Sequence, residues 1–180
     1  EEFRWPTLTH FNFALDWFDA LGQDPARADQ PALVITGDNG THQLTFAELS
    51  ARSTQVACWF QSLGVQRGDK FMMMLDNEVE LWEAMLAAIK IGAVILPTTV
   101  MLAPEALASR IKRAGVNWVL TNQQNIHKFA ELSALGVDVA ALGRIATGTT
   151  VVKDTHRYAD AYASTEEFVV DGPTPADAEM

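Results

Sequence analysis

The sequence predicts an α/β fold in layers, with a mainly parallel sheet flanked by helices. Segments of strand length alternate with segments of helical periodicity as far as Asn122. In the segment 70–75, every residue after Lys70 is apolar, which is typical of a strand covered on both faces. Such alternation favours right-handed strand–helix–strand units and a parallel sheet. The 180 residues suit one domain, or most of one.

The first elements are a helix and a hairpin. Residues 11–29 are expected to form a helix. One side of this helix carries a rough apolar stripe of Phe13, Trp17, Phe18 and Leu21. Strands over 32–36 and 42–46 flank the turn sequence Gly37-Asp38-Asn39-Gly40, and this arrangement predicts a β-hairpin. Thr45 and Glu48 fit a capping box at the start of the next helix. Gly64 follows that helix at the position where a left-handed residue is tolerated.

The later elements continue the alternation. A helix over about 79–91 is apolar around most of its circumference and is expected to be buried. Pro104 suits the first position of a helix that ends near Ala114. The remaining predicted elements are strands over 93–98, 117–122 and 144–147, helices over 125–135 and 157–163, and a loop over 149–156.

Composition and charge exclude several classes of function. The formal net charge of −10 argues against a nucleic-acid footprint and disfavours anionic membranes. No apolar stretch is long enough for membrane insertion, and the acidic start over 1–6 lacks the core of a signal peptide. Cys58 is the only cysteine, so no intrachain disulfide forms. We therefore expect a reducing, cytoplasmic location.

Two ordered stretches carry a family resemblance. Leu44–Leu49 reads LTFAEL and Ile89–Pro97 reads IKIGAVILP, with Leu63-Gly64-Val65 and Gly68-Asp69-Lys70 between them. Together they resemble the opening core motifs of the adenylate-forming (AMP-dependent) enzymes, which include acyl-CoA synthetases, peptide-synthetase adenylation domains and luciferases. The residues that look most like short- and medium-chain acyl-CoA synthetases are Asn12-Phe13-Ala14, Asn77, residues 80–85, Pro97-Thr98-Thr99 and Leu102.

The resemblance implies a reaction and a set of ligands. Such enzymes use ATP and Mg²⁺ to convert a carboxylate into an acyl-adenylate, and then transfer the acyl group to CoA. Their phosphate loop, [ST]-S-G-[ST]-T-G-x-P-K, does not occur in this chain. We therefore assign no catalytic, cofactor-binding or metal residue to it, and expect the 180 residues alone to be inactive. In this interpretation 1–170 is part of the large N-terminal α/β domain, and 171–180 is a linker-like tail.

One segment imitates the missing loop. Thr147-Gly148-Thr149-Thr150 resembles its centre, and Lys153 follows closely. However, the family pattern has a glycine after the second threonine and a proline before the lysine, whereas this chain has Val151 and Val152 there, and Lys153 comes one residue early. A β-branched pair lacks the backbone freedom that a phosphate loop needs. We interpret the segment as a strand end followed by a surface loop.

Other candidate residues have structural explanations as well as functional ones. Arg110, Lys112 and Arg113 suit a solvated helix face, with docking of a CoA phosphate as the alternative. Thr98 and Thr99 lie at the end of a predicted strand, at the sheet edge where open α/β sheets bind ligands. They are candidates for contacts near the substrate, with a role in the turn and in packing as the alternative. The residues that lack a convincing metal-binding or nucleophilic pattern are His10, His42, His127, His156, Cys58 and Met72-Met73-Met74.

Three alternatives to a short- or medium-chain synthetase stay open. An aryl-CoA ligase and a carrier-loading adenylation domain would share the two motifs. A stand-alone, non-catalytic binding module of flavodoxin-like architecture would carry them by coincidence. The sequence leaves the oligomeric state and the acyl-chain length undecided.

Overall fold

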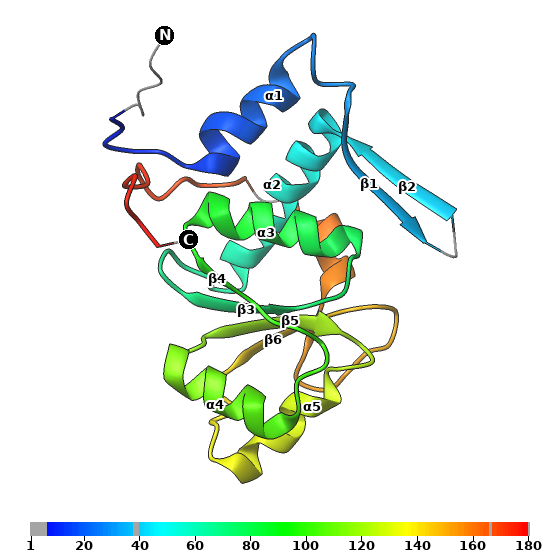
Figure 1. Ribbon diagram of the computed structural model, residues 1–180, viewed down its shortest axis with the longest axis vertical. Helices are drawn as coiled ribbons and strands as arrows, with labels where there is room; N and C mark the ends of the chain where they lie inside the picture. The colour runs from blue at the N-terminus through cyan, green and yellow to red at the C-terminus, as the bar shows by residue number, and fades with distance from the viewer. Residues whose placement is uncertain (1–6, 38–39, 166, 180) are drawn as a thin grey trace, which may run out of the picture.

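The computed structural model describes residues 7–37, 40–165 and 167–179. Its centre is a five-stranded parallel sheet in the order β4-β3-β5-β6-β7 (Figure 1). The strands are β3 (Lys70–Met74), β4 (Val94–Pro97), β5 (Trp118–Asn122), β6 (Gly143–Thr147) and β7 (His156–Arg157). The predicted α/β fold with a parallel sheet is confirmed.

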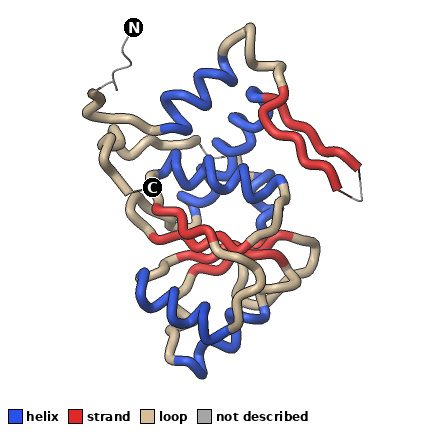
Figure 2. The backbone as a smooth tube through the Cα atoms, viewed as in Figure 1, coloured by secondary structure: helices blue, strands red, loops and turns tan. Residues whose placement is uncertain are grey.

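Helices cover both faces of this sheet (Figure 2). One face carries α2 (Phe46–Ser62), α3 (Val79–Ile91) and the 3₁₀ helix η3 (Tyr158–Ala163). The opposite face carries α4 (Pro104–Ala114), α5 (His127–Ala130) and the 3₁₀ helix η2 (Glu131–Leu135). Successive residues of β3 point to opposite faces, so Phe71 and Met73 join the first core, while Met72 and Met74 join the second. The methionine run is therefore core packing, as predicted.

An antiparallel hairpin precedes the sheet. It consists of β1 (Pro31–Gly37) and β2 (Gly40–Thr45). The two central turn residues, 38 and 39, lie outside the described residues. Thr45 then caps α2, because its hydroxyl accepts from the Glu48 amide at 3.2 Å and the Glu48 carboxylate accepts from the Thr45 amide at 2.9 Å. The predicted hairpin and capping box are both confirmed.

The first helix is shorter than the predicted 11–29. A π-helical turn, η1 (Phe13–Phe18), runs into α1 (Asp19–Gln23), and turns follow. Asp24 stops the helix because Pro25 comes next, and a residue before proline is disfavoured in helical geometry. The expected apolar stripe also divides, since Phe18 is buried whereas Phe13 and Trp17 are exposed.

The second half differs in detail from the prediction. The helix expected over 125–135 is two short pieces, α5 and η2, and the one expected over 157–163 is the 3₁₀ helix η3. Strand β7 lies at the end of the expected loop, where it pairs with β6. In the described part of the chain, none of the helices combines the length and apolarity needed to cross a bilayer.

The C-terminal tail lies against the N-terminal segment. The amide of Phe11 donates to the carbonyl of Thr174 at 2.9 Å, and the buried Thr174 hydroxyl accepts from the Asn12 side chain at 3.1 Å. The Arg67 guanidinium donates to the carbonyls of Asp171 and Gly172. Residues 171–179 thus make specific contacts, while their assignment as a linker stays a prediction.

Candidate functional site

The carboxyl ends of the parallel strands meet at one edge of the sheet, where open α/β sheets bind ligands. A cleft of about 420 Å³ lies along this edge. Its lining residues are Asp76, Glu78, Glu80, Asn122, Gln123, Gln124, Asn125, Thr147 and Gly148. The cleft is therefore rich in carboxylates and amides, and it contains no lysine or arginine among these residues.

Hydrogen bonds hold the acidic side chains of this cleft in place. The Thr147 hydroxyl donates to Glu78 Oε2 at 3.0 Å, and Asn122 Nδ2 donates to Asp76 Oδ2 at 3.4 Å. Partial burial raises the pKa of Glu78, although the bond from Thr147 acts in the opposite direction. The neighbouring carboxylates of Asp76 and Glu80 raise that pKa further. Such a cleft repels a polyanion rather than attracting it.

The segment that imitates a phosphate loop begins at the same edge. The backbone amides of Thr149 and Thr150 both donate to Gln123 Oε1, at 3.0 and 2.9 Å. Gly148 has φ +103°, and a Cβ at this position would lie 2.4 Å from the same oxygen. The amides that phosphate oxygens would need are thus occupied, and Lys153 is exposed. These residues do not fit ATP phosphates, and the segment is a strand end with a loop, as interpreted from the sequence.

A second cleft joins two sets of candidates that lie apart in the sequence. Thr98, Arg110 and Arg113 line a space of about 310 Å³, together with Met72, Leu96, Pro97 and Ala114. The three basic side chains of α4 are exposed, as predicted, and Lys112 donates to a carbonyl of η2 at 2.8 Å. Thr98 Oγ1 donates to the Leu96 carbonyl and Thr99 Oγ1 accepts from the Met101 amide, so both threonines serve the turn.

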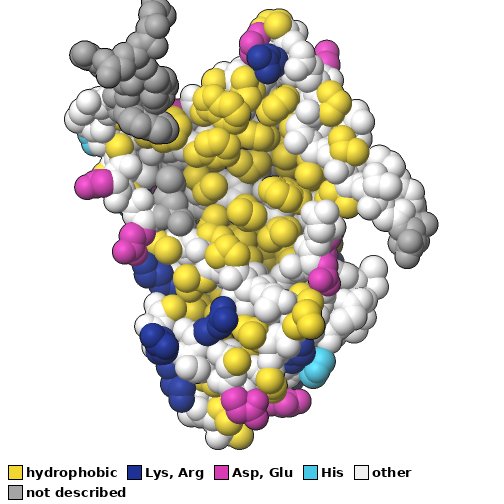
Figure 3. All heavy atoms as spheres, in the orientation of Figure 1, with side chains coloured by type: hydrophobic (Ala, Val, Ile, Leu, Met, Phe, Trp, Pro, Cys, Tyr) yellow, Lys and Arg dark blue, Asp and Glu magenta, His cyan; other side chains and the backbone are white. Residues whose placement is uncertain are grey.

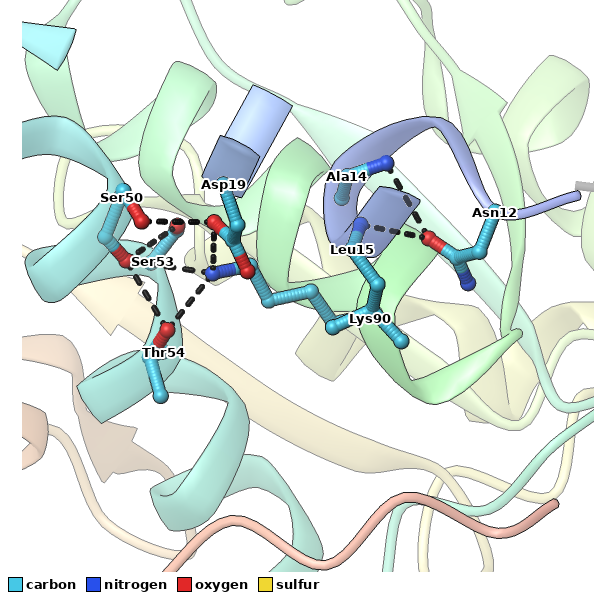
Figure 4. Close-up of polar contacts among 8 residues, drawn as sticks. All are labelled: Asn12, Ala14, Leu15, Asp19, Ser50, Ser53, Thr54 and Lys90. Atoms are coloured by element: carbon cyan, nitrogen blue, oxygen red, sulfur yellow. Dashed lines mark hydrogen bonds and ion pairs between the residues drawn. The ribbon is translucent and has the colours of Figure 1, made fainter. Parts of the chain in front are cut away.

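A buried ion pair was missed by sequence reasoning. Lys90 is 1% exposed, and its ammonium donates to Asp19 Oδ1 at 2.8 Å, the Ser50 carbonyl at 3.1 Å and Thr54 Oγ1 at 2.6 Å (Figure 4). Burial lowers the pKa of Lys90, and the hydrogen bond that Lys90 donates to Asp19 partly opposes this shift. The contacts join α1, α2 and α3. Lys90 is therefore a positioning residue for the N-terminal helices.

Glu83 is the second buried charge of α3. Its carboxylate accepts from Tyr162 at 2.6 Å, Tyr158 at 3.3 Å and Arg52 at 3.3 Å. Burial raises the pKa of Glu83 despite these donors. The sequence did carry a signal that Glu83 and Lys90 are buried, because it predicts burial of the helix that contains them. Their partners come from distant segments and could not be read from it.

The remaining candidates do not assemble into a site. The four histidines are exposed and lie on separate elements. Within 7–37, 40–165 and 167–179, histidine, cysteine and acidic side chains form no group of three that could hold a metal ion. Cys58 is buried in α2, as predicted for a core residue.

The fold is that of a parallel α/β protein with an N-terminal hairpin. Its family follows from comparison: the model of the family described as "AMP-binding enzyme" matches residues 23–179, so the chain belongs to that family. The match includes both motifs, Leu44–Leu49 and Ile89–Pro97. The resemblance to adenylate-forming enzymes is confirmed.

Sequence relatives of the chain include enzymes named as CoA ligases and acetyl-coenzyme A synthetases. The chain is 33% identical over 112 residues to 4-coumarate–CoA ligase 5 of Oryza sativa subsp. japonica. These aligned residues cover 62% of the chain and 20% of the relative. It is 39% identical over 88 residues to an acetyl-coenzyme A synthetase of Nostoc linckia, which covers 48% of the chain and 26% of the relative. The chain thus spans about a fifth to a quarter of the length of these relatives.

Solved structures share the fold. A Brucella canis acyl-CoA synthetase superposes with a TM-score of 0.79 at 24% identity, covering 94% of this chain and 30% of that one. The anthranilate–CoA ligase AuaEII, in complex with anthranoyl-AMP, gives a TM-score of 0.77 at 17% identity, covering 96% of this chain and 32% of that one.

Proposed function

We propose that the complete protein is an ATP-dependent acyl-CoA synthetase of the AMP-forming type, acting on a short- or medium-chain carboxylate. The observation that carries this proposal is the family match over residues 23–179. The acetyl-coenzyme A synthetase relatives favour a small aliphatic acid. We further propose a cytoplasmic location and Mg²⁺ as the metal that accompanies ATP.

The proposed reaction overcomes the poor electrophilicity of a carboxylate. A carboxylate oxygen bonds to the α-phosphorus of ATP, the bond from that phosphorus to the bridging oxygen breaks, and pyrophosphate leaves. The thiol sulfur of CoA then bonds to the acyl carbon, the thiol proton goes to a base, and AMP leaves. The first step removes the charge of the carboxylate and supplies AMP as a good leaving group. In the second step the bond between the acyl carbon and the phosphate oxygen of AMP breaks as the bond to sulfur forms.

The described residues fit a scaffold role in this reaction. The sheet-edge cleft is acidic and the amides of Thr149 and Thr150 already bind Gln123, so no phosphate step is assigned to this chain. We propose that ATP, Mg²⁺ and CoA bind mainly to polypeptide outside these 180 residues. In this proposal 1–170 is part of the N-terminal α/β domain, and 171–180 leads towards the phosphate loop.

An aryl-CoA ligase is the second candidate function. Relatives of this chain include enzymes named for 4-coumarate and 3-hydroxybenzoate. The two motifs do not discriminate between aliphatic and aromatic acids, because they form a capped helix and a helix–strand junction rather than an acyl pocket.

Substrate-dependent exchange of radioactive pyrophosphate into ATP tests the proposal. The product of the complete natural gene is assayed with acetate, butyrate, hexanoate, 4-coumarate and 3-hydroxybenzoate, and acyl-CoA is measured after CoA is added. We expect exchange and acyl-CoA with an aliphatic acid. Turnover only with aromatic acids would select the second candidate, and exchange without transfer to CoA would indicate carrier loading.

The 180-residue chain is assayed in parallel. We expect no exchange from it at a concentration at which the complete protein turns over. Exchange by the 180 residues would contradict the scaffold role. Specific ligand binding by a natural protein that ends at Met180, without turnover, would favour the binding-module alternative.

A further inference from the structure

A cavity of about 950 Å³ opens at the amino ends of the parallel strands. Trp118, Gly143 and His156, which are the first residues of β5, β6 and β7, line it. Its volume lies in the range of small-molecule sites. The acidic cleft described above follows the carboxyl ends of the same strands. The two spaces therefore lie at opposite edges of the sheet.

Two aromatic rings form one wall of this cavity. The centroids of the Trp118 and His156 rings are 6.5 Å apart and the rings are tilted by 40°. Gly143 makes room for the indole, because a Cβ at that position would lie 2.2 Å from the Trp118 ring. Trp118 is half-buried and His156 is exposed. The two rings therefore offer a surface on which a further aromatic ring can stack.

A guanidinium reaches the cavity from the other face of the sheet. Arg144 follows Gly143 in β6, so its side chain points away from the two rings, and it pairs with Val119 of the second core. Within 7–37, 40–165 and 167–179, Arg144 Nε is the one buried side-chain nitrogen or oxygen without a hydrogen-bond partner. Over the same ranges the guanidinium forms no ion pair. Since polar groups in this position are normally paired, Arg144 has donors available for a ligand.

The charges of the lining limit the ligand to a single negative charge. Arg144 is the one lysine or arginine among the lining residues, and the carboxylates are those of Asp69 and Asp154. Other lysine and arginine side chains gather over the region where Figure 1 places α4, at the lower left of Figure 3. One carboxylate on a ligand finds a partner in Arg144, whereas further negative charges would be repelled by the two aspartates. ATP and CoA are thereby disfavoured.

We propose that this cavity binds an arylalkanoate, a monoanion with an aromatic ring at one end and a carboxylate at the other. The ring stacks on Trp118 and His156, and the carboxylate accepts two hydrogen bonds from Arg144. A spacer between ring and carboxylate is required, because the rings and the guanidinium come from opposite faces of the sheet. The ligand is bound there and undergoes no reaction. This inference goes beyond the proposed function and does not depend on it.

Fluorine NMR of the complete natural protein labelled with 5-fluorotryptophan tests the site. The resonance of Trp118 is assigned with Trp118→Phe, and 3-phenylpropionate is the probe. We expect a saturable shift of this resonance. Three matched probes should bind about ten-fold or more weakly. They are 3-phenylpropionamide, which lacks the charge, hexanoate, which lacks the ring, and benzoate, which lacks the spacer.

Variants of the complete protein assign the carboxylate contact. Arg144→Gln should weaken binding of 3-phenylpropionate about ten-fold. Arg144→Lys keeps the charge but loses the planar fork, so it should give an intermediate loss. Arg27→Gln, which changes an exposed arginine in the turns after α1, is the control and should leave the affinity unchanged. His156→Ala should also weaken binding, and it serves if thermal denaturation shows that Arg144→Gln is unfolded.

Several results would overturn the proposal. One is the absence of a saturable shift at Trp118; another is equal affinity for 3-phenylpropionate and its amide. An unchanged affinity in folded Arg144→Gln would remove the guanidinium from the site, and tighter binding of ATP at the same resonance would contradict the limit to one charge. The proposed function fails separately, because pyrophosphate exchange can be present without a shift at Trp118, and the shift can be present without exchange.

Discussion

Removing Asp19 from the buried Lys90–Asp19 pair should cost more than removing both members of the pair. Lys90 donates all three ammonium hydrogens, and its side chain is fully buried. Asp19→Ala leaves this cation without its counter-charge, and breaking a buried pair in this way costs about 3–5 kcal/mol. Lys90→Met instead leaves the Asp19 carboxylate, whose side chain is 15% exposed and still accepts from the Ser50 hydroxyl at 2.6 Å.

The expected ranking of the three variants by loss of unfolding free energy follows from the full burial of Lys90 and the partial exposure of Asp19. Because water reaches Asp19, Lys90→Met should cost less than Asp19→Ala, on the order of 1–3 kcal/mol for a carboxylate that loses one charged donor. The double variant Asp19→Ala/Lys90→Met replaces the pair with apolar groups and should recover part of the loss from Asp19→Ala.

Urea denaturation followed by circular dichroism measures the free energy of unfolding for wild type and the three variants. The pH dependence gives a second test, because Asp19→Ala lets Lys90 relieve its burial by releasing a proton. In that variant, stability should rise with pH below the unfolded lysine pKa of 10.5. Additive losses in the double variant, or a larger cost for Lys90→Met than for Asp19→Ala, would refute the reasoning.

Three further predictions concern the cap, the core and the second buried charge of α3. Thr45→Ala removes the capping box of α2 and should cost about 1 kcal/mol of unfolding free energy in urea. Gly143→Ala places a Cβ 2.2 Å from the Trp118 ring and should cost about 1–3 kcal/mol, whereas the control Gly37→Ala, with nothing within 4 Å, should stay within about 0.5 kcal/mol of wild type; equal effects would show that the ring moves freely. Burial raises the pKa of Glu83, so its stabilising contribution is full below about pH 4.5 and is lost as pH rises through the folded value. Wild type should therefore lose stability relative to Glu83→Gln above pH 4.5, and a constant difference across pH would contradict this sign.

Local signals accounted for most of the sheet. The apolar run after Lys70 and the helix over 79–91 agree with β3 and α3, because both segments carry long apolar patterns that neighbouring residues establish. The capping box at Thr45 agrees because both of its bonds lie within four residues. The first helix was overestimated because the apolar spacing hid the stop at Asp24-Pro25.

The candidate site was less accessible to sequence reasoning. From their residue types alone, Thr147 and Gly148 were candidates for a phosphate-binding loop. The structure adds Gln123, which lies 26 residues before Thr149 and occupies its amide. Thr98 and Arg110 were judged separately, and only the packing of α4 against the sheet brings them to one cleft.

The sequence by itself determined the family, the parallel α/β class and the local start of α2, because each depends on short ordered patterns that neighbouring residues impose. Tertiary structure decided the rest. It turned Glu83 and Lys90 inwards and left Trp82 outside, and no periodicity of α3 could show this, since both arrangements use the same helix. The partners Asp19 and Tyr162 come from segments about 70 to 80 residues away. Long-range contacts therefore decided which residues of this largely apolar helix face the core and which stay exposed.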